Sequence, residues 1–218
     1  MKYLEFKNIT RRFPIISSSQ LFNITTKPRS LKNNLSIWQK KGLVIKLRKG
    51  LYILNEQDRK ITPSRLFIAN ALYSPSYIST EYALSYYGLI PERVEDITSV
   101  TTKKTIGFKN IFGSFPYQHL KTELFFGFTQ LTDESGLLTF LAYPEKAILD
   151  FIYLNLQEFK HKGLDIFEDS YRFGNLNTLK KNRLMEFARR YKNRVFIGVV
   201  NNLLKQITKA NTENKKVK

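Results

Sequence analysis

The chain has 218 residues, a formal net charge of +18 and no cysteine. Its hydrophobic fraction of 42% and aromatic fraction of 14% favour a folded protein that is long enough to bury a core. The lack of cysteine excludes disulfides, thiolate metal sites and cysteine nucleophiles, and two histidines, His119 and His161, are too few for most imidazole-rich metal centres.

The first residues, MKYLEFKNITRRF, lack the apolar core of a signal peptide. No apolar run approaches the roughly 18 residues that a membrane span needs. We therefore expect a cytoplasmic protein that does not cross a membrane.

Charge is distributed unevenly along the chain. Residues 1–60 hold 14 Lys and Arg against 3 Asp and Glu, residues 61–170 hold 9 against 13, and residues 171–218 hold 13 against 2. Two basic ends around an acidic middle favour two separate surfaces that face polyanions. The alternative is a coding bias toward lysine together with a solvated C-terminal face.

Two short helices are expected at the start of the chain. The first covers residues 2–12 and is ended by Pro14. The cluster Ser17–Ser19 is suited to capping the second, which contains Gln20, Leu21 and Phe22. Residues 23–27 then supply a turn.

A third helix, from Pro28 to about Lys41, combines a buried stripe with a polar face. Leu31, Leu35 and Trp38 are spaced i, i+4 and i+7 and form the stripe. The opposite face carries groups that can bond base edges or phosphates; these are Arg29, Lys32, Asn33, Ser36 and Lys40. Taken alone, this pattern also fits an ordinary amphipathic surface helix.

A predicted hairpin follows the third helix and decides how the helix is interpreted. Gly42 is a helix stop, and residues 43–47 and 51–54 read as strands around the turn Arg48-Lys49-Gly50. The order of helix, turn, helix and hairpin is typical of a winged helix-turn-helix. Its cations at the wing tip lie where a DNA backbone would run. We predict such a DNA-binding domain over residues 1–57.

The remainder, residues 61–218, is predicted to form a larger mixed domain after a polar linker over residues 55–60. Helices are expected from Thr62 to about Tyr73 and from Ser79 to Gly88. Short aromatic and β-branched runs then suggest a small antiparallel sheet, over residues 97–102, 105–108, 115–119, 123–129 and 137–142. A helix from Pro144 and two helices over residues 178–191 and 194–208 close the chain. The predicted fold class is α+β.

No catalytic residue, metal ligand or cofactor is predicted. The chain lacks the P-loop, HExxH and GxSxG motifs. Glu145 and Asp150 are five residues apart on a helix and point to different faces, which is a poor arrangement for paired carboxylates. Glu145 is interpreted as meeting the positive end of its own helix, and Asp150 as an i,i+4 partner of Lys146. His119, beside Tyr117 in a strand, is interpreted as structural.

Cations gather on the helix over residues 178–191. Its apolar side leaves basic residues facing outward, where they repel one another unless an anionic surface faces them. A solvated face, a nucleic acid and an acidic protein surface are all compatible with this pattern. The residues proposed for this surface are Lys180, Lys181, Arg183, Arg189 and Arg190.

Three stretches resemble one protein family. They are KKGLVIKLRKGLYIL, YISTEYALSYYGLIPE and LTFLAYPEKAILDFIYL, in that order, and they span roughly residues 38–155. The pieces Ser79–Ile90 and Pro144–Asp150 are the more specific. The chain is similar here to the antitoxins of type IV toxin–antitoxin systems of the abortive-infection E kind, which are transcriptional regulators in phage defence.

The resemblance implies a repressor that binds inverted repeats in the double-stranded promoter DNA of its own operon. It also implies a larger domain that antagonises a cognate nucleotidyltransferase-like toxin without forming a stable complex. A stand-alone winged-helix regulator, or a nucleic-acid-processing protein with no toxin partner, is the alternative.

The resemblance also assigns roles to individual residues. The operator contacts would be Ser19, Lys27, Arg29, Lys32, Asn33 and Ser36, with Arg48 and Lys49 on flanking phosphate. The resemblance assigns no residues to the antitoxicity surface; from their charge we expect the five cations from Lys180 to Arg190 to form it. Ser79, Tyr87, Glu145, Lys146 and Asp150 are interpreted as polar contacts that specify the fold.

Overall fold

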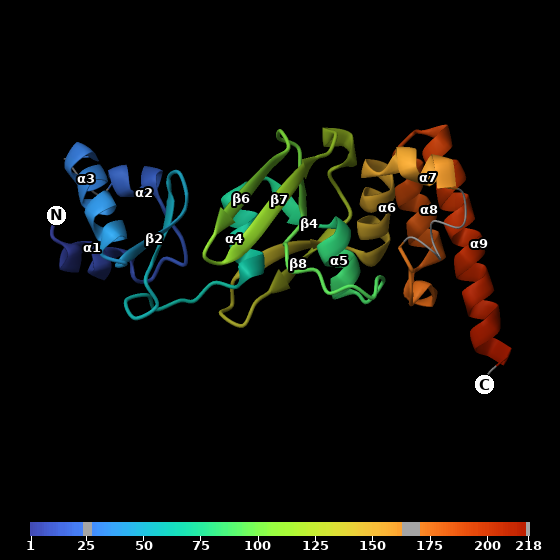
Figure 1. Cartoon of the computed structure of the whole chain (residues 1–218), viewed down its shortest axis with the longest axis horizontal. Coiled ribbons are helices and arrows are strands. Elements are labelled where there is room, and N and C mark those ends of the chain that lie inside the picture. Colours follow the sequence, from blue (N-terminus) through green and yellow to red (C-terminus); the bar gives the residue numbers. More distant parts are fainter. Residues whose placement is uncertain (24–27, 163–170, 217–218) are drawn as a thin grey trace.

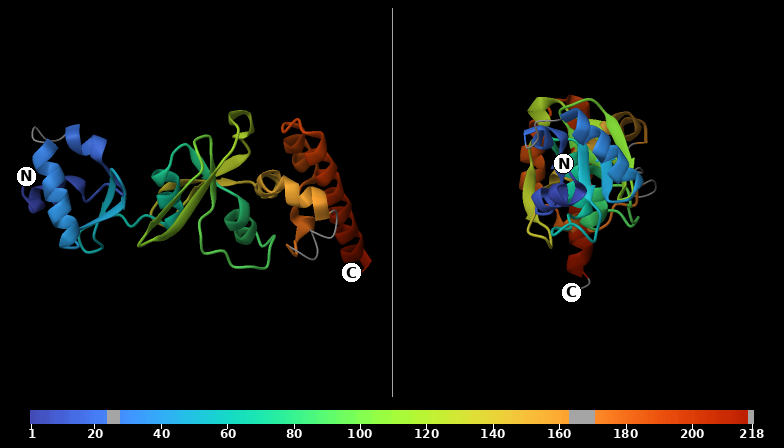
Figure 2. Two further views of the ribbon diagram at one scale, coloured as in Figure 1. Left: turned by 45° about the horizontal axis from the view of Figure 1, so that its top comes forward. Right: turned by 90° about the vertical axis from the view of Figure 1, so that its left-hand side faces the viewer.

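The computed structural model describes residues 1–23, 28–162 and 171–216, with side chains for residues 1–21, 29–160 and 171–208. Three parts follow one another along an elongated molecule, and the two further views agree (Figures 1 and 2). Small helices and a small sheet lie at the N-terminal end, a larger sheet lies in the middle, and helices lie at the C-terminal end. The architecture is mixed α+β.

The N-terminal unit extends from α1 to β3. Its sheet is antiparallel in the order β1-β3-β2. Leu31, Leu35 and Trp38 are buried, with 2, 4 and 7% of their surface exposed, so the predicted apolar stripe is confirmed. The elements are α1 (Tyr3–Thr10), β1 (Ile16–Ser17), α2 (Ser18–Asn23), α3 (Pro28–Lys40), β2 (Val44–Arg48) and β3 (Leu51–Leu54).

The start of α2 is fixed by a reciprocal contact. The Gln20 amide N–H donates to Ser17 Oγ at 3.2 Å, and the Ser17 amide N–H donates to Gln20 Oε1 at 3.0 Å. This pairing satisfies backbone donors that a helix start otherwise leaves open. The serine cluster therefore caps α2, as its sequence predicted.

The second unit contains a six-stranded sheet in the order β6-β7-β5-β4-β9-β8. The predicted small antiparallel sheet is wrong in this respect, because β4 runs parallel to β9 and β5 runs parallel to β7. The strands are β4 (Ser76–Ile78), β5 (Ser99–Thr101), β6 (Ile106–Asn110), β7 (Gly113–His119), β8 (Phe128–Thr132) and β9 (Leu138–Ala142). The sequence patterns missed β4, which lies between β5 and β9 and supplies one of the two parallel pairs.

α4 and α5 contact the sheet, and the helices from α6 onward lie toward the C-terminal end of the molecule (Figure 1). α6 is buried from Glu145 to Ile152, and both α8 and α9 pack against it. The helical elements are α4 (Arg65–Leu72), α5 (Thr80–Tyr86), the 3₁₀ turn η1 (Thr122–Leu124), α6 (Pro144–Leu154), α7 (Leu156–Lys162), the 3₁₀ turn η3 (Leu176–Thr178), α8 (Lys181–Arg189) and α9 (Arg194–Lys216). Among the described residues, no helix has both the length and the apolarity that a membrane span requires.

The two units meet where β2 lies beside β6. Three buried side chains of the N-terminal hairpin, Leu47, Leu51 and Ile53, belong to the hydrophobic core of the second unit. The predicted domain boundary lies between β3 and α4, so this contact is made by residues on the N-terminal side of it.

Candidate nucleic-acid interface

One face of α3 is exposed and carries four of the predicted DNA contacts. The side chains of Arg29, Lys32, Asn33 and Ser36 are all exposed, opposite the buried stripe. No hydrogen bond or ion pair joins them to another described residue. They are therefore available to a ligand, and they offer two cations, an amide and a hydroxyl on one helix.

The charge around this face is not neutralised locally. No Asp or Glu occurs between Glu5 and Glu56, while eleven Lys and Arg do. The next acid, Asp58, accepts a hydrogen bond from the Tyr3 hydroxyl at 2.6 Å and pairs with Lys7. The Lys7 contact, and then the Tyr3 contact, hold the pKa of Asp58 below its ordinary value. This acid-free run accounts for most of the basic excess that the charge distribution showed over residues 1–60.

The remaining two predicted operator contacts are Ser19 and Lys27. Ser19 is exposed, and its Oγ lies 2.9 Å from Ser17 Oγ at the start of α2. Lys27 lies outside the described residues.

The two cations of the β2–β3 turn face different surroundings. Lys49 is exposed. Arg48 is half-buried, and its Nε donates to the Leu72 carbonyl oxygen at 2.5 Å while its Nη1 donates to the Lys49 carbonyl oxygen at 2.9 Å. The guanidinium carbon also lies 6.0 Å from the centre of the Phe108 ring. The structure thus directs Arg48 toward the second unit.

Three of the five predicted surface cations on and beside α8 contact other side chains, which the sequence did not predict. Arg183 Nη1 lies 3.5 Å from Glu145 Oε2, and Arg190 lies over the Phe126 ring at 3.5 Å. Lys181 donates to Thr208 Oγ1 at 2.9 Å. The Arg183 side chain is partly exposed, and it lies beside the buried Glu145 because α8 packs on α6. The side chains of Lys180 and Arg189 are exposed.

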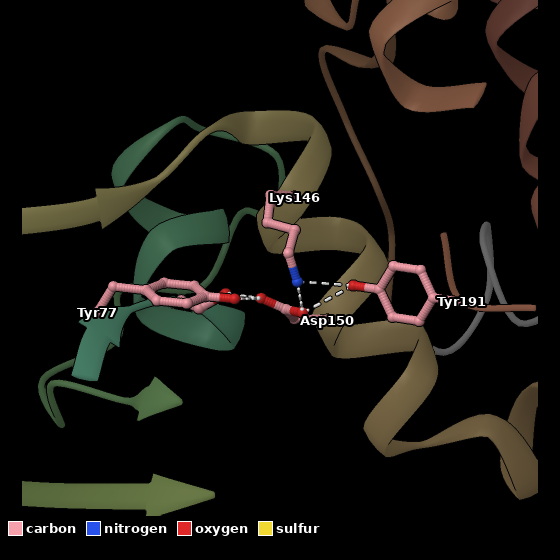
Figure 3. A network of polar contacts seen from close by, with 5 residues as sticks. Tyr77, Lys146, Asp150 and Tyr191 are labelled. Atoms are coloured by element: carbon pink, nitrogen blue, oxygen red, sulfur yellow. Dashed lines mark hydrogen bonds and ion pairs between the residues drawn. The ribbon is translucent and has the colours of Figure 1, made fainter. Parts of the chain in front are cut away.

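A buried polar cluster joins the sheet to the C-terminal helices (Figure 3). We call it the Asp150 network; its members are Tyr77, Ser79, Lys146, Asp150 and Tyr191. Asp150 Oδ2 accepts hydrogen bonds from the Tyr77 and Ser79 hydroxyls, each at 2.9 Å. Asp150 Oδ1 accepts from Lys146 and, at 2.8 Å, from the Tyr191 hydroxyl. Four donors occupy the roughly four lone-pair positions of a carboxylate, so the network holds its elements together without a vacant acceptor.

Burial dominates the electrostatics of this network. Lys146 and Asp150 are both fully buried, and Lys146 Nζ lies 4.9 Å from the centre of the Phe126 ring. Burial lowers the pKa of Lys146, and the adjacent Asp150 carboxylate opposes that shift. Burial, and then the charge of Asp150, raise the pKa values of Tyr77 and Tyr191 well above the ordinary tyrosine value. Both hydroxyls therefore stay protonated and donate.

The other motif residues make contacts in the same region. Glu145 lies in the first turn of α6, as predicted, and its Oε1 also accepts the Lys180 amide N–H at 2.8 Å, at the start of α8. The Tyr87 hydroxyl donates to the Ala142 carbonyl oxygen at 2.8 Å. These contacts agree with the interpretation of Ser79, Tyr87, Glu145, Lys146 and Asp150 as residues that specify the fold. Tyr77 and Tyr191 were missed, and only the Lys146–Asp150 spacing on an apolar helix pointed to a buried partner.

No protein-family model matches the chain, and no curated protein matches it.

Proposed function

We propose that this protein binds duplex DNA through α3, as the recognition helix of a winged helix-turn-helix, and represses its own operon. The observation that carries the proposal is the exposed face of α3. Arg29, Lys32, Asn33 and Ser36 have no partner among the described residues, and the surrounding run from residue 6 to residue 55 contains no acid. Acting in the cytoplasm, such a protein would meet its promoter directly.

The chemistry of these side chains suits the major groove. A helix of 13 residues is about 20 Å long, and its width fits a groove about 12 Å across. Asn33 can pair with an adenine edge through two hydrogen bonds, and Arg29 and Lys32 can bond a guanine edge or a phosphate. Lys49 lies at the hairpin turn, where it can contact flanking phosphate.

We further propose that the second unit antagonises a nucleotidyltransferase-like toxin, without a stable complex. The support is the sequence resemblance over residues 38–155. Lys180 and Arg189 are the exposed cations that we would test first for this role, because Arg183 and Arg190 contact Glu145 and Phe126.

Replacing Arg29 or Lys32 by alanine should weaken binding to the promoter of the operon. A lost base-edge contact costs on the order of 1–3 kcal/mol, whereas a lost phosphate contact weakens binding to all sequences equally. A mobility-shift titration against promoter DNA and against unrelated DNA separates the two cases.

The matched control is Lys121→Ala, which removes one exposed cation from the second unit. It should leave promoter binding unchanged. If the α3 variants bind the promoter as tightly as the unmodified chain, α3 is not the recognition helix.

A further inference from the structure

Hydrogen bonds in both directions join the β2–β3 hairpin to the second unit. Arg48 donates from Nε to the carbonyl oxygen of Leu72, the last residue of α4. In the other direction, Asn110 Nδ2, at the end of β6, donates to the Leu47 carbonyl oxygen at 3.2 Å. The buried side chains of Leu47, Leu51 and Ile53 in the hairpin also belong to the hydrophobic core of the second unit.

The same hairpin is tied to the helices of the N-terminal unit. The Leu43 amide N–H donates to the Trp38 carbonyl oxygen at 2.9 Å, which connects the end of α3 to the strand β2. The Ser18 amide N–H donates to the Gly50 carbonyl oxygen at 2.8 Å, which connects the start of α2 to the turn. Gly50 has φ +82°, and a Cβ there would lie 3.0 Å from Ser18 Oγ, so the turn fits closely against α2.

We propose that Arg48 and Asn110 form a clamp that fixes the orientation of α3 relative to the second unit, and that Arg48 is a positioning residue instead of a phosphate contact. To reach a phosphate, Arg48 would have to leave two carbonyl acceptors and the Phe108 ring. Lys49, which is exposed, is then the cation of the turn that meets DNA. The DNA part of this inference rests on the proposed function, whereas the clamp itself does not.

The clamp has a consequence for recognition. A helix held rigidly to a larger body can meet a duplex only from directions that the body leaves open. A change of the Asn110 side chain, or a shift of the end of α4 that carries the Leu72 carbonyl oxygen, would then alter how α3 is presented to DNA.

The first test compares the salt dependence of binding to a random-sequence duplex of about 30 base pairs. Each phosphate contact contributes about one unit to the slope of log affinity against log salt concentration. Lys49→Ala should therefore make the slope less steep by about one unit, and Arg48→Ala should leave it unchanged. A slope that falls by about one unit in Arg48→Ala would overturn the assignment of Arg48.

The second test needs no DNA. The chain has no cysteine, so the exposed positions Asn8 and Lys121 can be changed to cysteine and spin-labelled as a unique pair. The distance distribution between the labels, measured by pulsed dipolar spectroscopy, should be narrow in the otherwise unmodified chain and in Lys49→Ala. It should broaden in Arg48→Ala and in Asn110→Ala.

The outcomes of the two tests are separable. A distribution that stays narrow in both Arg48→Ala and Asn110→Ala overturns the clamp, whatever happens with DNA. Circular dichroism of each variant shows whether its secondary structure is retained. If one variant fails to fold, the other decides the result. If the unmodified chain binds no duplex at low salt, the proposed function is refuted. The clamp is then still tested by the distance measurement, which needs no DNA.

Discussion

Lys146 and Asp150 show how much the surroundings of a residue pair change its effect on stability. On an exposed helix, an ion pair four residues apart contributes about 0.3–0.5 kcal/mol. Here both side chains are fully buried and share hydrogen bonds with Tyr77, Ser79 and Tyr191. Removing one partner leaves an uncompensated buried charge, which typically costs about 3–5 kcal/mol.

Lys146→Met should therefore lower the free energy of unfolding by about 3–5 kcal/mol. Methionine is close to lysine in length, so the loss reflects the missing ammonium group and not a large cavity. Urea unfolding followed by far-ultraviolet circular dichroism measures the effect. Lys121→Met is the exposed control and should stay within about 0.5 kcal/mol. A cost below about 1 kcal/mol for Lys146→Met would mean that Asp150 is already compensated by its three hydroxyl donors.

Asp58 gives the N-terminal unit a defined response to acid. Its folded-state pKa is lowered from 3.8, chiefly by the bond to Lys7 and then by that to Tyr3. A carboxyl group with a lowered folded pKa stabilises the fold fully above its unfolded pKa. That contribution is lost as the pH falls from about 3.8 through the folded pKa.

Asp58→Asn should consequently lower the melting temperature at pH 6, and the difference from the unmodified chain should shrink toward pH 2. Thermal unfolding at a series of pH values between these limits measures it. A difference that stays constant over the range would show that the Asp58 charge does not contribute.

At the scale of elements, helix periodicity and turn chemistry were reliable guides in the N-terminal unit. The stripe of α3 repeats with helical spacing, and Gly42 and Gly50 have φ of +69° and +82°, as the predicted helix stop and tight turn require. The exposed face of α3 follows directly from that stripe. These features are local, so the sequence contains the information that defines them.

Elements in the second unit were harder to predict because their identity depends on neighbours. β4 has three residues, all buried, and so shows no alternation between an inner and an outer face. The predicted strand over residues 123–129 is instead η1 followed by β8, which begins only at Phe128. Between them, Gly127 has φ +75°, a conformation that no regular strand contains.

Side-chain direction was the least predictable part of the candidate site. A cation in a turn can face solvent, DNA or another part of the chain, and Arg48 faces a carbonyl 24 residues away. The hydroxyls that bind Asp150 come from 73, 71 and 41 residues away. No local pattern encodes such pairings.

For the whole molecule, the contact between the units determines how the two proposed activities should be separated. Deleting the N-terminal unit would remove Leu47, Leu51 and Ile53 from the hydrophobic core of the second unit and expose the side chains that they cover. A truncated chain could then lose activity through unfolding alone. Substitutions on the exposed face of α3 avoid this problem.

The full-length double variant Arg29→Ala/Lys32→Ala should lose promoter repression and still neutralise the toxin, because α3 lies at the opposite end of the molecule from α8 and α9 (Figure 1). A promoter–reporter assay measures repression. Growth rescue from a co-expressed nucleotidyltransferase-like toxin measures neutralisation. Loss of both functions would contradict independent surfaces, and failure of the unmodified chain to rescue growth would favour a stand-alone regulator.

Trp38 is the chain's one tryptophan, and it lies in the core of the N-terminal unit. The centre of its ring lies 4.8 Å from that of the Phe6 ring and 5.4 Å from that of the Tyr3 ring. Only 7% of the Trp38 surface is exposed. Selectively excited indole emission therefore comes from this unit alone, without a contribution from the six-stranded sheet or the C-terminal helices. The protein thus contains a built-in optical probe that reports loosening of α3 separately from melting of the rest of the chain.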